Sequence, residues 1–470
     1  MATERDTIFA LSSGRPPAAI AVVRMSGPQA GAALERLIGR IPAARRATLA
    51  RLRHPVTGEV IDEGLALWFP GPNSETGEDI VELQVHGGRA VIAAVLAALA
   101  GLPGLRPAEA GEFTRRAFEN GRMDLTAVEG LADLVAAETE AQRRQAFQHL
   151  KGLLGARAET WRKRLIEALA LVEAGIDFPD EDDVPRDLIA RALALTRPLA
   201  DEIVQAAAGR GERLREGMRI AIAGPPNVGK STLFNRLAGR EAAIVSPLPG
   251  TTRDVLELHL DLGGYPVTVL DTAGIRDAAD SIEREGVRRA GEQVSTADLV
   301  LWVVDATAID AQAPFAAFPS AAQLSSAAMP WMVLNKMDLL SAGDQQRIES
   351  EFSKEAANLC AAHSNKPGVN VNFVSSTTGA GVDKLVNALA RCSSGFFTAE
   401  PALVTRERHR AHLNEAALAL RDAERAAQDG REELMAEHLR LATRALGKLL
   451  GRVDVEDVLD VIFRDFCIGK

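Results

Sequence analysis

The sequence predicts a multidomain protein with an N-terminal α+β domain, a discontinuous all-α helical domain and, inserted into the latter, an α/β domain with a doubly wound sheet. Three observations favour this fold class. The length of 470 residues allows about three domains. Strand-like and helix-like runs alternate around a glycine-containing loop in the middle of the chain, as in a parallel sheet. The segments on either side, from Asp124 and after Phe397, show helical periodicity without strand signals.

The N-terminal residues 1–122 are expected to form the α+β domain, because strand and helix signals are mixed there. The most unusual polar stretch of this domain, Gly71 to Glu78, is rich in turn-forming residues and is expected to be a surface loop. The strand-like runs are 19–23, 65–69 and 80–85, and the helix-like runs are 29–38 and 90–100.

The helical domain is expected to combine residues 123–216 with residues 392–470, because both segments carry apolar stripes that need a partner surface. Leu125, Val128 and Leu131 fall on one face of a helix that Asp124 caps. Further helices are expected over 188–214, 412–427, 433–450 and 455–462. The inserted domain, 217–391, is expected to contain a hairpin over 255–262 and 267–270 and buried strands at 299–304, 331–334 and 371–374.

The loop from Gly224 to Ser231, Gly-Pro-Pro-Asn-Val-Gly-Lys-Ser, ends an apolar run and opens a helix-like run. This order of strand, glycine loop and helix is typical of a phosphate-binding P-loop. Backbone N–H groups at the start of the helix attract phosphate oxygens. Lys230 is expected to contact the β- and γ-phosphates, and the hydroxyl group of Ser231 is expected to bind Mg²⁺.

Two downstream motifs, each following a strand-like run, complete a nucleotide site. Asp271-Thr-Ala-Gly274 offers a carboxylate on the Mg²⁺ side and a backbone N–H for the γ-phosphate. In Asn335-Lys-Met-Asp338, the last carboxylate can accept from N1–H and the 2-amino group of guanine. Adenine would leave that acceptor unpaired, which is costly in a buried site. The sequence therefore predicts GTP as the nucleotide.

Composition limits the other possibilities. The apolar content of 47% and the charged content of 25% are typical of a soluble globular protein. The charged N-terminus lacks the apolar core of a signal peptide, and no apolar run is long enough to span a membrane, so we expect a cytoplasmic protein. The three cysteines lack the spacing of a disulfide framework or a zinc site. The net charge of −10 argues against electrostatic wrapping of nucleic acid but leaves room for a local basic face.

Four motifs together resemble the MnmE (TrmE) family of tRNA modification GTPases over essentially the whole chain. They are Gly224–Ser231, Gly250-Thr-Thr-Arg-Asp254, Gly71-Pro-Asn-Ser-Glu-Thr-Gly-Glu-Asp79 and the terminal Phe466-Cys-Ile-Gly-Lys470. The resemblance implies a Ras-like G domain and a K⁺-activated GTPase that modifies carbon 5 of the wobble uridine in tRNA. It also implies a homodimer, a heterotetramer with an FAD-containing MnmG-like partner, and a one-carbon unit from 5,10-methylene- or 5-formyl-tetrahydrofolate.

The resemblance also implies the site residues. Lys230 and Glu283 are the implied catalytic residues, with Glu283 orienting water in place of the glutamine that follows Asp-Thr-Ala-Gly in many small GTPases, since Ile275 stands there. Ser231 and Thr252 bind Mg²⁺, and Asn227, Ser246, Leu248 and Thr251 bind K⁺. Folate contacts fall on Arg24, Glu82, Arg122 and Lys470. The nucleotide contacts are Asn227, Val228, Gly229, Lys230, Ser231, Thr232, Ser246, Pro247, Leu248, Pro249, Gly250, Thr251, Thr252, Asp271, Thr272, Ala273, Gly274, Asn335, Lys336 and Asp338.

The sequence departs from the family pattern at two places. Arg122 stands where lysine is familiar, which keeps the charge but changes the geometry of a folate contact. Ser375-Ser-Thr377 replaces the usual Ser-Ala-Lys/Arg turn that stacks on guanine. Two alternatives also stay open: a ribosome-assembly GTPase switch without modification chemistry, which would need no folate pocket, and an ATPase, which Asp338 opposes.

Overall fold

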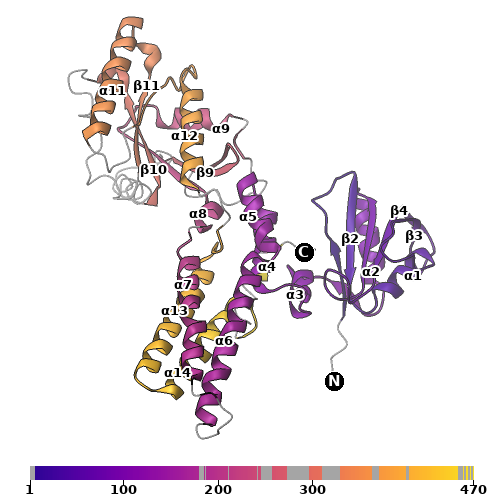
Figure 1. Ribbon diagram of the computed structural model, residues 1–470. Coiled ribbons are helices and arrows are strands. Elements are labelled where there is room, and N and C mark those ends of the chain that lie inside the picture. The colour runs from indigo at the N-terminus through magenta and orange to yellow at the C-terminus, as the bar shows by residue number, and fades with distance from the viewer. Residues whose placement is uncertain are drawn as a thin grey trace, which may run out of the picture. The chain divides into compact units, whose positions relative to one another are not determined.

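The structure is a computed structural model that describes residues 6–178, 185, 187–209, 211–240, 242–244, 257–271, 296–309, 329–362, 370–397, 402–453, 459, 462–463, 466 and 469 (Figure 1). The chain forms two compact units. The first contains Met1–Ala132, Phe147–Ala208 and Arg408–Lys470, and the second contains Asp133–Ala146 and Gly209–Glu407.

The N-terminal part of the first unit is built on a mixed sheet of strand order β3-β4-β5-β2-β1-β6. The short β6 pairs in parallel with β1, and all other pairs are antiparallel. Alternate residues of β1 point to opposite faces, so Phe9 packs in the core with α1 and α2 while Ile8 packs with Phe113 of α3. The elements are β1 (Thr7–Leu11), β2 (Ile20–Ser26), α1 (Ala30–Ile38), β3 (Thr48–Arg53), β4 (Val60–Phe69), β5 (Ile80–His86), α2 (Arg89–Ala100), β6 (Leu105–Pro107) and α3 (Glu112–Glu119).

The helical part of the first unit brings together two segments that are far apart in the sequence. Helix α6 packs against both α7 and α14. Trp161 and Leu165 of α6 are fully buried, as are Leu439 and Leu446 of α14, so the discontinuous helical domain is confirmed. The helices of this part are α4 (Leu125–Ala136), α6 (Leu153–Asp177), α7 (Leu188–Ala207), α13 (Glu407–Gln428) and α14 (Glu432–Leu450). Most of helix α5 (Glu140–Leu150) is assigned to the second unit.

One predicted helix, 188–214, is wrong in its extent. Helix α7 ends at Ala207, and a separate short helix, α8, covers Gly211–Glu216. Gly209 and Gly211 disfavour helix at this point, and a Cβ atom at Gly211 would lie 2.3 Å from the carbonyl oxygen of Val404. Most of the helix predicted over 455–462 lies outside the described residues.

The second unit contains a six-stranded sheet of order β12-β11-β10-β7-β9-β8. Among the strands that the structure describes in this sheet, only the hairpin strand β8 is antiparallel to its neighbour. The inserted doubly wound domain is therefore confirmed, and with it the predicted fold class. The elements are β7 (Met218–Ala223), α9 (Lys230–Ala238), β8 (Glu257–Leu262), β9 (Tyr265–Asp271), β10 (Leu299–Asp305), β11 (Met329–Asn335), α11 (Ala342–Ala362), β12 (Asn370–Phe373) and α12 (Val382–Phe396).

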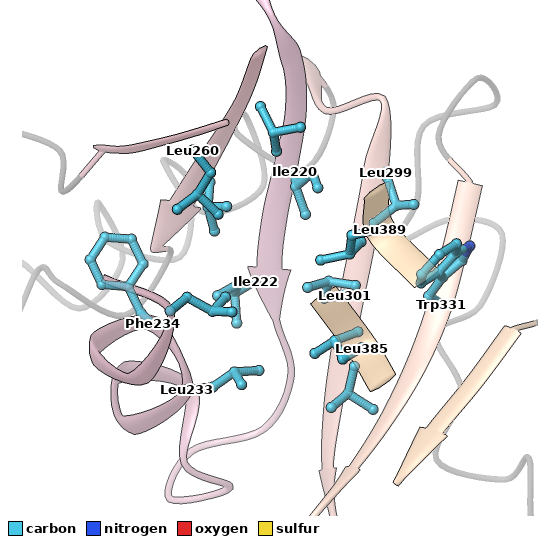
Figure 2. Close-up of a cluster of buried hydrophobic side chains, with 14 of the residues drawn as sticks. Ile220, Ile222, Leu233, Phe234, Leu260, Leu299, Leu301, Trp331, Leu385 and Leu389 are labelled. Carbon is cyan, nitrogen blue, oxygen red and sulfur yellow. The ribbon is translucent and has the colours of Figure 1, made fainter. Parts of the chain in front are cut away.

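Helices cover both faces of this sheet. Figure 2 shows Ile222 of β7 and Leu301 of β10 in one cluster with Leu233 of α9 and Leu385 of α12. On the opposite face, Phe352 of α11 packs with Met332 and Leu334 of β11. Burying each of these apolar side chains contributes roughly 1.5–3 kcal/mol. This packing fixes the carboxyl ends of β7, β9 and β11, and the nucleotide motifs begin at or directly after these ends.

Among the helices that the structure describes, none has both the length and the apolar character needed to cross a membrane.

Candidate functional site

The P-loop connects the end of β7 at Ala223 to the start of α9 at Lys230. Two of its glycines have positive φ angles, 140° at Gly224 and 95° at Gly229. A Cβ atom would lie 2.2 Å from the carbonyl oxygen of Val303 at Gly224, and 2.4 Å from Nδ2 of Asn335 at Gly229. Both positions therefore require glycine for conformation and for space.

The first turn of α9 presents the predicted phosphate and Mg²⁺ groups. Lys230 lies over the loop, where its Nζ donates to the carbonyl oxygens of Gly224 at 2.9 Å and Pro225 at 2.8 Å. Ser231 and Thr232 are exposed beside it, and Asn227 is exposed within the loop. The backbone N–H groups and the dipole of a helix N-terminus favour an anion at this position.

Asn335, at the end of β11, connects three loops of the predicted site. Its side chain is almost fully buried. Nδ2 donates to the carbonyl oxygen of Val228 in the P-loop at 2.8 Å. Oδ1 accepts from the backbone N and from Oγ of Ser376, each at 2.9 Å. The phosphate loop, the Asn335–Asp338 loop and the turn that starts at Ser375 thus form one hydrogen-bonded frame.

Lys336 and Asp305 form an ion pair within this frame. Asp305 lies opposite Asn335 in the β10–β11 register, and its Oδ2 is 2.7 Å from Nζ of Lys336. Burial acts to raise the pKa of Asp305, but hydrogen bonds from Lys336 and Thr307 outweigh it, so the pKa lies below its ordinary value. Asp338 follows in a short 3₁₀ turn, Met337–Leu339. The sequence prediction missed Asp305, although an acid directly after an apolar strand of this sheet is a detectable signal.

Several predicted residues lie outside the part of the chain that the structure describes. For Asp271, the last residue of β9, the structure describes the backbone but not the side chain. These predictions stay predictions. They are Ser246, Pro247, Leu248, Pro249, Gly250, Thr251, Thr252, Thr272, Ala273, Gly274, Glu283 and Lys470.

The N-terminal sheet brings two of the predicted folate residues together. Arg24 of β2 and Glu82 of β5 are register partners. Nε and Nη2 of Arg24 donate to Oε1 of Glu82 at 3.0 and 2.8 Å, and Nη1 lies 2.9 Å from Oε2 of Glu75. Gly77 lies in the 71–78 loop, which also contains Glu75. The side chain of Arg122 passes beside it, since a Cβ atom at Gly77 would lie 3.4 Å from Cγ of Arg122.

A buried arginine that the sequence prediction missed holds this loop in place. Arg116 of α3 is 5% exposed. It donates to Glu78 at 3.1 Å and to Glu112 at 3.0 Å. Glu78 also accepts from Oγ of Ser26 at 2.7 Å. The only sequence signal for Arg116 is its spacing of four residues from Glu112, which predicts an ion pair on a helix but not the contact with Glu78.

Comparison with known proteins gives matches over the whole chain. The family model described as "GTP-binding protein TrmE N-terminus" matches residues 7–122, and the model described as "MnmE helical domain" matches residues 125–467. Proteins named tRNA modification GTPase MnmE are similar to it: that of Bradyrhizobium sp. strain BTAi1 is 54% identical over 99% of both chains. Those of Rhodopseudomonas palustris strain BisB18 and Rhodospirillum rubrum are 53% and 52% identical over 100% and 99% of both chains, respectively.

Proposed function

Because this chain belongs to the MnmE family of tRNA modification GTPases, we propose that it couples K⁺-activated GTP hydrolysis to the modification of carbon 5 of the wobble uridine, U34. Its partner is an FAD-containing, MnmG-like protein with which it forms a heterotetramer, and it is itself a homodimer. Together they install a carboxymethylaminomethyl or aminomethyl group on certain tRNAs. The one-carbon unit comes from 5,10-methylene- or 5-formyl-tetrahydrofolate.

The frame around Asn335 is the observation that supports the nucleotide part of this proposal. It holds the phosphate loop beside the base-recognition loop through the bond from Asn335 to Val228. Water attacks the γ-phosphorus of GTP, the bond from that phosphorus to the bridging oxygen breaks, and GDP and phosphate leave. Lys230 offsets the phosphate charge from the first turn of α9.

The proposed cation sites use residues of the same loop. Ser231 offers a hydroxyl group to Mg²⁺ with Thr252, and Asn227 offers a side-chain carbonyl to K⁺ with Ser246, Leu248 and Thr251. When bound, these cations offset the negative charge on the phosphates in the transition state. The exposed positions of Asn227 and Ser231 beside the helix N-terminus fit such roles.

The proposed folate site is in the N-terminal domain, residues 1–122. Arg24 presents a planar guanidinium group suited to a carboxylate or carbonyl, and Glu82 can accept from N–H groups of a pterin ring. Lys470 is proposed to join them. Gly469, the residue before it, lies against β1, since a Cβ atom there would be 2.3 Å from the carbonyl oxygen of Leu11. This placement supports a contact of the tail with the N-terminal domain of the same chain.

The base specificity of Asp338 tests the proposed nucleotide site. We expect the protein to hydrolyse GTP in preference to ATP. The Asp338→Asn variant should prefer xanthosine triphosphate, because an amide can donate to the 2-oxo group that replaces the 2-amino group of guanine. Steady-state hydrolysis of the three nucleotides by both proteins measures this. If the variant keeps its preference for guanine, Asp338 does not contact the base.

A further inference from the structure

The turn at residues 375–378 lacks the basic side chain that its family pattern would place at 377. Its backbone is tightly held: the N–H of Ser375 donates to the carbonyl oxygen of Ala380 at 2.8 Å, and the N–H of Thr378 donates to Oγ of Ser375 at 3.1 Å. Ser375 and Ser376 are buried, whereas Thr377 is exposed. A short, uncharged threonine cannot cover a base as a long basic side chain does.

An arginine from a different element reaches this turn. Arg236 lies on α9, the helix that begins at the P-loop. Its Nε donates to the carbonyl oxygen of Ser376 at 3.0 Å, and its Nη2 donates to the carbonyl oxygen of Thr377. One planar guanidinium group thus donates from two separate nitrogen atoms, Nε and Nη2, to two successive carbonyl oxygens. Lysine carries a single nitrogen and lacks this rigid fork.

These bonds close a ring of contacts around the site. Ser376 is bound on one side by Asn335, which is bound in turn to Val228 of the P-loop. On the other side, the carbonyl oxygen of Ser376 accepts from Arg236, which belongs to α9. The turn is therefore fixed at two points, to the P-loop through Asn335 and to α9 through Arg236.

We propose that Arg236 is a positioning residue for guanine recognition. It holds the 375–378 turn from the phosphate-binding helix, in a chain whose turn has threonine at 377. The proposal rests on the proposed contact of Asp338 with the base and on the family resemblance, which places this turn beside the guanine. Arg236 acts through the turn, so its loss affects base affinity and selectivity while the Asp338 contact is retained.

The test is equilibrium binding of fluorescent N-methylanthraniloyl-GDP, with unlabelled GDP and ADP as competitors. Arg236→Ala should weaken GDP binding roughly fivefold to tenfold, the loss expected for two charge-assisted hydrogen bonds from an exposed arginine. The selectivity for GDP over ADP should fall by the same factor. Arg236→Lys keeps the charge without the fork and should recover only part of the loss.

Arg240→Ala is the matched control. This arginine follows the same helix and pairs with Asp383 of α12 rather than with the turn, so GDP affinity should stay within about twofold, as for a surface ion pair. Equal losses of GDP and ADP affinity in Arg236→Ala would contradict the proposal, because they would indicate an effect on the phosphates. Full recovery by lysine would also contradict it.

The Asp338→Asn variant separates the location of the base site from the role of Arg236. If that variant retains guanine preference, the base site itself is misassigned. If it loses guanine preference while Arg236→Ala binds GDP as tightly as the wild type, the base site stands and the role of Arg236 is wrong. Circular dichroism and a thermal melt of each variant confirm that the domain is folded.

Discussion

A buried acid in the helical part of the first unit should carry a large share of its stability. Glu129 of α4 is 2% exposed. Its Oε2 lies 2.6 Å from Nε2 of His409 and 2.8 Å from Nη2 of Arg408, and its Oε1 accepts from Nε of Arg408 at 3.0 Å. Arg408 also donates to the carbonyl oxygen of Leu449 at 3.2 Å. Through these bonds, one carboxylate connects α4, α13 and the end of α14.

Replacing Glu129 by glutamine removes the charge and turns one acceptor oxygen into a donor that faces other donors. Removing one member of a buried ion pair typically costs 3–5 kcal/mol, and because the amide keeps one acceptor we expect about 3 kcal/mol. Trp161 of α6 is fully buried in the same part and can report the loss. The background for this measurement replaces the other three tryptophans with phenylalanine: Trp68→Phe, Trp302→Phe and Trp331→Phe.

Urea unfolding followed by Trp161 fluorescence measures the effect. The matched control is Glu173→Gln on α6, where the acid pairs with Arg440 at 2.8 Å on the surface, with 42% of its side chain exposed. Surface pairs contribute little, so the control should unfold at the urea concentration of the parent. If Glu129→Gln also unfolds there, the buried network does not stabilise the helical part and the reasoning is refuted.

The pH dependence gives an independent check. Burial acts to raise the pKa of Glu129, but the hydrogen bond from His409 and the charge of Arg408 outweigh it and hold the pKa below its ordinary 4.5. Burial lowers the pKa of His409 below 6.5, and the bond to Glu129 offsets this only in part. Both groups bind protons more readily in the unfolded chain than in the folded protein. Their contribution to the free energy of unfolding is therefore present at neutral pH and is lost as the pH is lowered.

The two contributions are lost in different ranges of pH. That of His409 declines as pH falls below about 6.5, and that of Glu129 as pH falls below about 4.5 towards its lower folded pKa. The difference in stability between the parent and Glu129→Gln should therefore narrow below about pH 4.5. A difference that stays constant down to pH 3.5 would show that the carboxylate charge is not its source.

Three further predictions concern the proposed chemistry. Hydrolysis should be faster in K⁺ than in Na⁺ at equal ionic strength, and equal turnover in the two salts would exclude the proposed K⁺ site around Asn227. Glu283→Ala should keep its GTP affinity while its single-turnover rate in K⁺ falls by roughly 10²-fold or more. An unchanged rate would show that Glu283 does not orient the attacking water. Calorimetry should detect binding of 5-formyltetrahydrofolate, and Arg24→Gln should weaken it. Arg51→Gln is the control, because Arg51 forms a surface pair with Glu63. The absence of any heat of binding with folded parent protein would contradict the proposed folate site.

The elements that the sequence predicts well are those whose signals are local. The P-loop is one such element, because a strand, two constrained glycines and a helix follow each other within a few residues, and the structure gives β7, the loop and α9 in that order. The Asn335 motif is similar, since it directly follows a buried strand. The family resemblance is confirmed by relatives that match over the full length.

The contacts that the sequence does not predict join residues that are distant along the chain. Arg116 and Glu78 are 38 residues apart, and Arg236 and Ser376 are 140 residues apart. Their pairing depends on how the elements pack, which no local pattern records. Arg24 and Glu82 were predicted only through the resemblance, and their contact follows from the β2–β5 register. Helix α7 was predicted too long because an apolar stripe continues past the glycines that end it.

Mass spectrometry of wobble uridines tests the central claim most directly. Three strains supply the tRNA: one in which the gene for this protein is deleted, and two in which the deletion is complemented by the wild-type gene or by the Lys230→Ala variant. The substitution removes the ammonium group beside the P-loop carbonyl oxygens. We predict that the modification at carbon 5 of U34 is lost in the deletion, restored by the wild-type protein and not restored by Lys230→Ala. An unchanged profile of U34 modifications in the deletion strain would contradict the account and favour a GTPase switch without modification chemistry.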